Sequence, residues 1–283
     1  MPAYDEILTQ VVTLLHTLPD TPERARQELV LQITLGTALQ ATKGYGTPEL
    51  EKAYSRARDL CQQVGEVSQL FPVLWGLWGY YTTRGESHAG REVGEQFLTL
   101  AQNLQDPALL LVAHTIIGGI VSWRDDLLTG RAHLEHAIAL YDPEQHHSLA
   151  FLYGQDPRVL CLCYTSMVLW MLGYPDQALV KIREALTLAR SLAHPFSLIE
   201  ALVFVAQIHQ YRREGHAAQE QAEEAITLGT EQEIPLWLAI GIVLRGWALT
   251  DDGVLAMKTY VDLPFEQRRA WLERPTNPGY KGR

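Results

Sequence analysis

The sequence of 283 residues has few cysteines and no excess of basic residues. Its three cysteines, Cys61, Cys161 and Cys163, are an odd number and too few for a disulfide framework. We expect them to be small buried residues in a reducing compartment. Lysine and arginine total 23 against 33 acidic residues, a net charge of −10. This balance argues against nucleic acid as the partner, because binders of a phosphate backbone usually carry a basic surface.

The sequence also lacks a long apolar run. No stretch reaches the ~18 consecutive apolar residues that a membrane-spanning helix needs. The longest, from Leu109 to Val121, is interrupted by His114, Thr115 and a pair of glycines. The N-terminus has neither the basic segment nor the unbroken apolar segment of a signal peptide. We therefore expect a cytoplasmic protein without a membrane segment.

Motifs of the common enzyme classes are missing as well. The sequence contains no G-x-x-x-x-G-K-[ST] loop for phosphates, no G-x-S-x-G around a serine nucleophile and no H-E-x-x-H. Gly44-Tyr45-Gly46 lacks the preceding strand that a dinucleotide site requires. We predict a protein with no catalytic residue, no metal and no cofactor.

Two histidines have a spacing that a metal site could use. His133 and His136 lie three residues apart, on one face of a predicted helix. Two ligands do not make a site, however, and no third is evident nearby. We interpret both as solvated histidines on a helix face, and His146-His147 as part of a polar loop.

What the sequence does contain is a repeat of about 40 residues. Pro195 and Pro235 are 40 residues apart, and the small residues Ser166, Ala206 and Gly246 have the same spacing. Such a period is typical of paired amphipathic helices, in which small residues let the two helices approach closely. No alternating pattern of a β-strand is present.

Prolines predict where the helices begin, because proline suits the first helical position and a preceding Thr or Asp can cap the helix. They predict helix pairs at about residues 22–64, 72–104, 107–141, 157–192, 195–232 and 235–260. A further helix is expected at residues 4–18, and a connector from Tyr141 to Asp156. The predicted fold is an all-α, TPR-like solenoid of about six antiparallel helix pairs in a right-handed superhelix.

Three parts follow from this pattern. Residues 1–20 form an N-terminal helix, residues 21–260 form the repeat solenoid, and residues 261–283 form an irregular C-terminal tail with several prolines. The tail has too slight a basic excess to indicate nucleic-acid binding.

The first helix of each pair lines the concave face of such arrays, which presents an extended binding surface. Positions around the small mid-helix residue of the last three repeats predict a mixed apolar and amide groove for an extended or helical peptide. Its residues are Leu160, Cys163, Met167, Trp170, Glu200, Val203, Gln207, Gln210, Ile240, Val243 and Trp247. The seven tryptophans either fill gaps between helices or line this groove.

Several unusual segments occur together and in a fixed order: LPDTPERARQEL (18–29), ATKGYGTPELEKAYSRARDLC (41–61), LFPVLWGLWGYY (70–81), GRAHLEHAIALYDPEQH (130–146) and LGYPDQAL (172–179). Over roughly residues 18–250 the chain resembles the C-terminal TPR region of bacterial "predicted ATPase" signalling proteins. In that family a class III adenylate or guanylate cyclase domain, or a kinase domain, precedes a P-loop ATPase module and the TPR region. The resemblance implies a TPR fold and a scaffold or sensor role, without a catalytic residue.

Three functions remain open from the sequence. The leading one is a scaffold that binds a protein or peptide, as the regulatory part of a larger ATPase–cyclase signalling protein. The alternative is a domain that senses a small-molecule effector, as in ATP-dependent transcription regulators. The third is an enzyme, which no motif favours. We expect neither nucleic acid nor a membrane as a partner.

Overall fold

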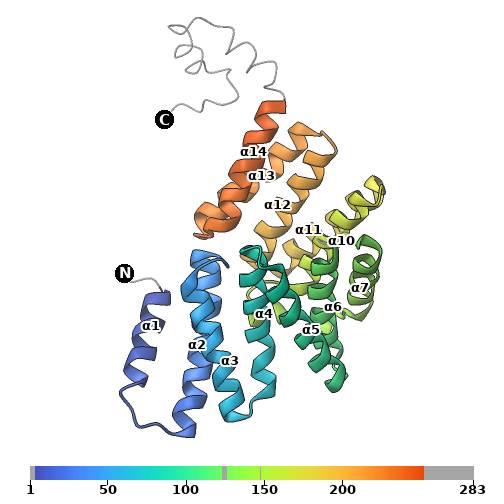
Figure 1. Cartoon of the computed structure of the whole chain (residues 1–283). Helices are drawn as coiled ribbons and strands as arrows, with labels where there is room; N and C mark the ends of the chain where they lie inside the picture. Colours follow the sequence, from blue (N-terminus) through green and yellow to red (C-terminus); the bar gives the residue numbers. More distant parts are fainter. Residues whose placement is uncertain (1–3, 123–125, 147, 252–283) are drawn as a thin grey trace, which may run out of the picture.

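The computed structural model describes residues 4–122, 126–146 and 148–251 (Figure 1). These residues form fourteen helices and contain no strand, which confirms the all-α prediction. The helices are α1 Tyr4–Leu15, α2 Pro22–Lys43, α3 Pro48–Val64, α4 Val67–Thr83, α5 Ser87–Leu104, α6 Pro107–Ser122, α7 Leu127–Leu140, α8 Pro143–His146, α9 Leu149–Tyr153, α10 Pro157–Met171, α11 Pro175–Leu192, α12 Pro195–Tyr211, α13 Gly215–Glu231 and α14 Pro235–Asp251.

The long helices pack in consecutive pairs, as the repeat predicts. The pairs are α2–α3, α4–α5, α6–α7, α10–α11 and α12–α13, and α14 begins a sixth. Each pair also packs on the next, so the array forms one continuous curved stack (Figure 1). The expected helix at residues 4–18 is α1. The predicted partner of α14, up to residue 260, and the predicted tail at residues 261–283 lie outside the described residues.

Side-chain caps explain several of the helix starts. The Thr21 side chain accepts a hydrogen bond from the backbone N–H of Arg24 at the start of α2. Asp156 accepts one from Val159 at the start of α10. In each case a proline follows the cap, where a missing N–H has no cost because the first helical N–H groups have no partner within the helix.

One predicted start is wrong. Pro72 was expected to open a helix, but α4 begins at Val67 and contains Pro72 in its second turn. A proline there removes one hydrogen bond and crowds the carbonyl group one turn earlier. The helix is buried at every residue from Phe71 to Tyr80, so its packing offsets that loss.

The connector between the third and fourth pairs is more ordered than predicted. It contains α8 and α9, and His146, interpreted as polar loop, is buried. The Nδ1 atom of His146 accepts the backbone N–H of Asp142 at 3.0 Å. Tyr153 on α9 is buried against Trp75, with ring centroids 5.1 Å apart. The connector therefore packs into the core.

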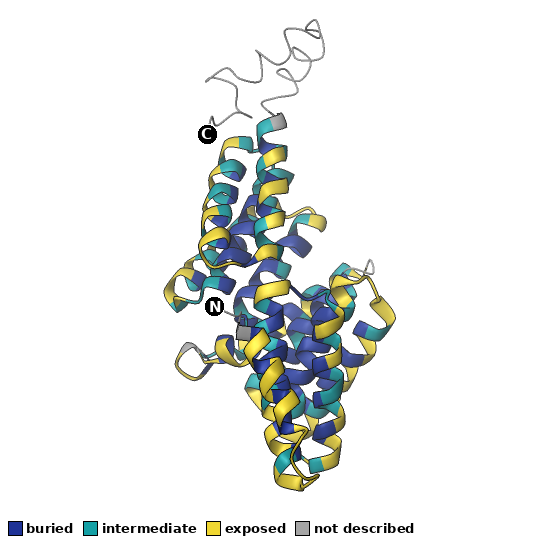
Figure 2. Ribbon diagram, turned by 90° about the vertical axis from the view of Figure 1, so that its left-hand side faces the viewer, coloured by how far each residue is buried: buried dark blue, intermediate teal, exposed yellow. Residues whose placement is uncertain are grey.

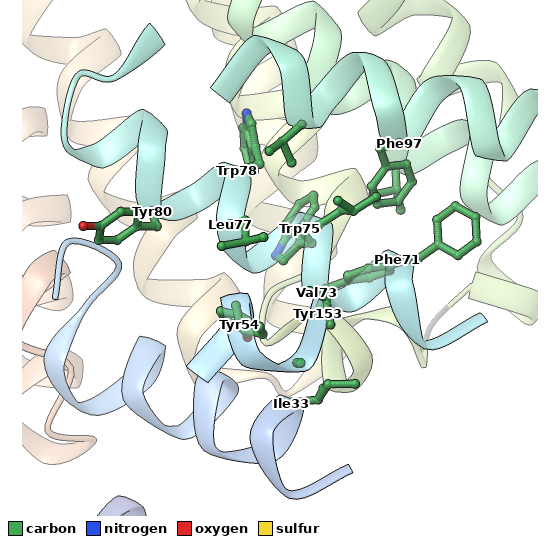
Figure 3. Close-up of a cluster of buried hydrophobic side chains, with 14 of the residues drawn as sticks. Ile33, Tyr54, Phe71, Val73, Trp75, Leu77, Trp78, Tyr80, Phe97 and Tyr153 are labelled. Atoms are coloured by element: carbon green, nitrogen blue, oxygen red, sulfur yellow. The ribbon is translucent and has the colours of Figure 1, made fainter. Parts of the chain in front are cut away.

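The largest core cluster lies in the first three pairs, where buried residues line the contacts between the helices (Figure 2). Tyr54, Trp75 and Phe97 are among its largest fully buried side chains (Figure 3). Each such side chain contributes roughly 1.5–3 kcal/mol through the apolar area that it buries. Gly36 and Gly76 face the Tyr54 ring so closely that a Cβ atom at either position would overlap it.

The small mid-helix residues are confirmed at two of three positions. Ser166 and Ala206 are fully buried between helices. Gly246 is exposed, and no atom lies within 4 Å of a Cβ placed there. The reason is that α10 and α12 have helices on both sides, whereas α14 is the last helix of the described residues.

Candidate functional site

The face predicted as an open groove is largely closed. Five of its eleven residues are buried: Leu160, Cys163, Met167, Glu200 and Val203. Five more are partly buried: Trp170, Gln207, Gln210, Ile240 and Trp247. Val243 is exposed. Binding of a partner by this set stays a prediction, because nothing in the structure tests it. Three members, Leu160, Glu200 and Ile240, meet in one cavity.

The face is closed because the first and last repeats meet across it. The C-terminal helix α14 contacts α2, and Leu236 lies against Gly44 in the α2–α3 turn (Figure 1). Tyr45, the next residue of that turn, is buried and makes an edge contact with Phe196 of α12, with ring centroids 6.4 Å apart. The Tyr45 hydroxyl donates a hydrogen bond to Oε1 of Gln155. Segments more than a hundred residues apart are thereby joined.

A glycine makes this closure possible. A Cβ atom on Gly79 of α4 would overlap the Tyr45 ring. The sequence Gly44-Tyr45-Gly46 therefore serves to insert an aromatic ring between repeats. Our prediction treated it only as a turn, and the one sequence signal for its role is an aromatic residue placed between two glycines.

The elements that meet here enclose a cavity of about 230 Å³, which we call the central cavity. Its walls come from the α2–α3 turn, α4, Gln155 between α9 and α10, α10 itself, α12 and α14. They are rich in aromatic rings and contain no lysine, arginine or histidine: Tyr45, Trp78, Gly79, Thr82, Thr83, Gln155, Leu160, Tyr164, Glu200, Phe204, Leu236, Trp237 and Ile240. Thr82 and Thr83 are exposed, so the cavity reaches the surface at the end of α4.

Glu200 is the carboxyl group of the central cavity. Its side chain is 1% exposed, yet no hydrogen bond or ion pair to it exists among the described residues, and Oε2 is sealed from solvent without a partner. Burial, and then the nearby charge of Asp156, raise the pKa of Glu200 well above its ordinary value. Burial therefore favours the neutral form of the carboxyl group.

Further polar atoms around the cavity lack partners. The indole Nε1 atoms of Trp78 and Trp237 are buried with no acceptor. Asp156 uses one carboxylate oxygen to cap α10, its other oxygen is unpartnered, and burial raises its pKa to about 6. Since native proteins pair the great majority of buried polar atoms, unpartnered ones in a cavity wall are candidates for pairing with a ligand.

A histidine cluster lies elsewhere, on α6 and α7. The Nδ1 atoms of His114 and His133 are 2.8 Å apart, and the rings of His114 and His136 have centroids 4.4 Å apart. His133 is thus half-buried rather than solvated, and the sequence could not reveal His114 because it belongs to the other helix. Burial, and then the neighbouring histidines, lower the pKa of His114 to about 4. Within the described ranges, no group of side chains has the arrangement of a metal site.

The cysteines behave as predicted. All three are free and buried. Burial raises the pKa of Cys61 to about 11 and that of Cys161 to about 12, so neither is a thiolate at neutral pH. In the part of the chain that the structure describes, no helix combines the length and apolar character needed to cross a bilayer.

Comparison with known proteins gives distant similarities. No family model matches the chain. An uncharacterized protein of Rhizobium meliloti (strain 1021), R02095, is 21% identical over 237 residues, which cover 81% of this chain and 22% of that protein. The chain therefore spans about a fifth of the length of this relative.

Two solved structures have similar arrangements of helices. The apo form of RapI has a TM-score of 0.49 and 11% sequence identity, covering 97% of this chain and 72% of RapI. BtubC (BKLC) from P. vanneervenii has a TM-score of 0.48 and 15% identity, covering 94% and 95% of the two chains. At this distance neither similarity carries an argument about function. The resemblance to ATPase–cyclase proteins also stays a prediction.

Proposed function

We propose that this chain is a non-catalytic regulatory module that holds a small-molecule effector in the central cavity. The observation that carries the proposal is Glu200, a buried carboxyl group in the cavity wall with no protein partner. A buried polar group without a hydrogen bond costs roughly 1–3 kcal/mol. A ligand that pairs with it recovers that free energy, which favours the sensor over a peptide groove on this face.

The placement of the cavity supports a regulatory role. Its walls combine the second, fourth, fifth and sixth repeats with Tyr45 from the turn of the first. A ligand that contacts both ends of the array binds one curvature of the stack better than another. Differential binding of this kind is what allows an effector to shift a conformational equilibrium.

A larger signalling protein is the context that we propose for the module. Two observations support it: the resemblance of residues 18–250 to the TPR region of ATPase–cyclase proteins, and a relative about five times longer than the matched segment. In that context the array would pass effector binding to an adjoining ATPase module.

A thermal-shift screen with metabolites tests the sensor role, because a ligand that binds only the native state raises the melting temperature. The screen uses the wild type and two variants of α14. Ile240→Trp fills the central cavity, whereas Ile242→Trp changes a residue that is 47% exposed and does not line it. We expect an effector to stabilise the wild type and Ile242→Trp but not Ile240→Trp. Equal shifts in both variants, or no effector at all, would contradict the proposal.

A second candidate is the protein-binding scaffold, which a separate groove favours. It lies between α7, α10 and α11, has a volume of about 450 Å³ and combines an apolar floor with a charged rim: Arg131, Glu135, Ile138, Thr165, Leu169, Asp176, Gln177, Val180 and Lys181. Val180 is 61% exposed in it. Open apolar grooves with polar rims are typical of protein interfaces.

Photo-crosslinking in cells tests this scaffold role. A photoreactive residue replaces Val180 in the groove or, as a control, Val30 on α2, which is 55% exposed. A discrete adduct from position 180 alone is expected. Identical adducts from both positions, or none, would rule out this groove as the interface.

A further inference from the structure

The wall of the central cavity is acidic. Glu200 is the one carboxyl group among the residues that line it, and no basic side chain lines it. Asp156, also fully buried, lies close enough for its charge to raise the pKa of Glu200. The charge of Arg158 acts on Asp156 and partly offsets the effect of its burial, but no basic side chain lines the cavity beside Glu200.

The groups that face Glu200 from the surrounding helices do not supply a cation either. The α2–α3 turn contributes Tyr45, and α10 contributes Tyr164 and Cys163; burial and the charge of Glu200 raise the pKa of all three, so they stay neutral. From α4 and α14 come uncharged residues. The buried residues of α11 and α13, which flank α12, are small or apolar: Ala178, Ile182, Ala185, Ala189, Ala218, Ala222, Ala225 and Gly229.

Aromatic rings form much of the remaining wall. Phe204 makes contacts with both Tyr164 and Trp237, with ring centroids 6.1 Å apart in each case, and Trp78 and Tyr45 complete the set. The faces of such rings are electron-rich and attract organic cations, tryptophan most strongly. A desolvated carboxyl group beside several aromatic faces is complementary to an ammonium group.

We propose that the central cavity binds a small organic cation, an amine or a quaternary ammonium compound, with Glu200 as its counterion. The proposal rests on the effector role proposed above and names its ligand. A metal cation does not fit, because hard cations take six to eight oxygen ligands and this wall is mainly aromatic. The volume of about 230 Å³ is below the ~300 Å³ of the smallest drug-sized pockets, so the ligand is small.

Binding has a defined proton balance. The carboxylate form of Glu200 pairs with the cation, and any proton that the carboxyl group carries in the free protein passes to solvent when the cation binds. The indole N–H groups of Trp78 and Trp237 lack acceptors, so an oxygen atom on the ligand adds to its affinity. Choline, which has both a quaternary ammonium group and a hydroxyl group, is the first probe.

Isothermal titration calorimetry of the full chain tests the inference. The probes are choline, tetramethylammonium, the uncharged choline analogue 3,3-dimethylbutan-1-ol, and acetate. We expect both cations to bind, the uncharged analogue to bind at least tenfold more weakly, and acetate not to bind. The affinity for choline should rise with pH, because the cation pairs with the carboxylate of a group whose pKa is raised in the free protein. Repeating the titration in buffers with different ionisation enthalpies measures the number of protons released on binding.

A pair of variants assigns the effect to Glu200. Glu200→Gln keeps the shape of the side chain and should lose at least tenfold in choline affinity together with its pH dependence. Glu220→Gln changes an exposed acid on α13 and should bind as the wild type does. Unfolding curves of both variants confirm that they are folded. Equal choline binding by Glu200→Gln would overturn the inference.

The outcomes separate this inference from the function on which it depends. Binding of uncharged or anionic compounds that Ile240→Trp abolishes, without any binding of cations, would overturn the cation assignment and leave the effector role standing. Absence of binding by cations, uncharged compounds and anions alike would overturn both.

Discussion

Two glutamates are fully buried, one in each half of the molecule, and their surroundings are opposite. Glu28 on α2 is 0% exposed and accepts two hydrogen bonds from Arg56, at 2.6 and 2.8 Å, while His16 lies 3.0 Å away. Burial acts to raise the pKa of Glu28, but the bonds from Arg56 and His16 outweigh it and lower the value to about 2. Glu200 on α12 is 1% exposed and has no partner, and its pKa is raised.

The comparison shows what burial of an acid achieves in each place. Glu28 is ionised and ties α2 to α3 through Arg56, so its role is structural. Glu200, whose pKa is raised by burial, makes no hydrogen bond or ion pair with another described residue, yet it lies in the wall of a cavity. A buried acid that lowers the stability of the fold and forms no hydrogen bond within the chain is best explained by a ligand that pairs with it.

The largest expected effect is on the structural acid. Glu28→Gln leaves Arg56 without its charged partner and should lower the free energy of unfolding at pH 7 by about 3 kcal/mol. Urea unfolding measures it, and Glu23→Gln, a change at a 74% exposed side chain of the same helix, is the control. A loss no greater than in that control would mean that Glu28 is not structural.

The other acid should respond in the opposite direction. The folded-state pKa of Glu200 is raised, so above its ordinary value of 4.5 the unfolded chain gives up a proton that the folded chain keeps. The contribution of Glu200 to stability therefore falls as pH rises above 4.5, whereas the stabilising contribution of Glu28 is present above 4.5 and lost as pH falls towards 2.

Glu200→Gln should remove that decline. We expect the stability of the variant relative to the wild type to increase as pH rises above 4.5. Urea unfolding from pH 5 to 7 measures the slope. A difference that does not depend on pH would contradict a raised pKa of Glu200.

A smaller effect concerns the closure of the central cavity. Gly79→Ala places a methyl group against the Tyr45 ring and should cost about 1–2 kcal/mol through overpacking. The same substitution at Gly246, which has open space around it, should be neutral or should stabilise α14 by up to about 1 kcal/mol. Equal changes in the free energy of unfolding for the two substitutions would show that the Tyr45 ring does not pack against Gly79.

The smallest expected effect on stability comes from the histidine cluster, and its pH dependence is independent of the two acids. Because the pKa of His114 is lowered to about 4, the contribution of His114 to stability falls as pH falls from 6.5 towards 4. His114→Asn should reduce this loss by about 1 kcal/mol, since partial exposure screens the effect. Thermal unfolding at pH 7 and 5 measures it, with His88→Asn, an 85% exposed position, as control. An unchanged loss would assign the acid sensitivity to other groups.

Much of the fold could be predicted from the sequence because the signals are local. Proline with a preceding cap marks helix starts, and five of the six predicted starts are correct. Pro72 misled the prediction because its cost inside α4 is offset by tertiary packing, which no local pattern reports. The connector was treated as loop because α8 and α9 are short and are stabilised by contacts such as that of Tyr153 with Trp75.

The candidate site was harder to predict because it depends on how far the array curves. Helical periodicity predicts that Leu160, Glu200 and Ile240 share one face, and all three line the central cavity. It could not show that Tyr45, from the first repeat, closes that face and turns a groove into a cavity. Helical periodicity determines which residues share a face, whereas the distance between repeats far apart in sequence depends on the summed packing of all the helices.

The ionisation state of Glu200 tests the central claim most directly. The ¹³C chemical shift of its side-chain carboxyl group, assigned by comparison with Glu200→Gln, distinguishes the neutral acid from the carboxylate. The account predicts that the carboxyl group of the free protein titrates well above its ordinary pKa and that choline lowers this pKa. Titration at the ordinary value in the free protein, or a titration that choline leaves unchanged, would contradict it.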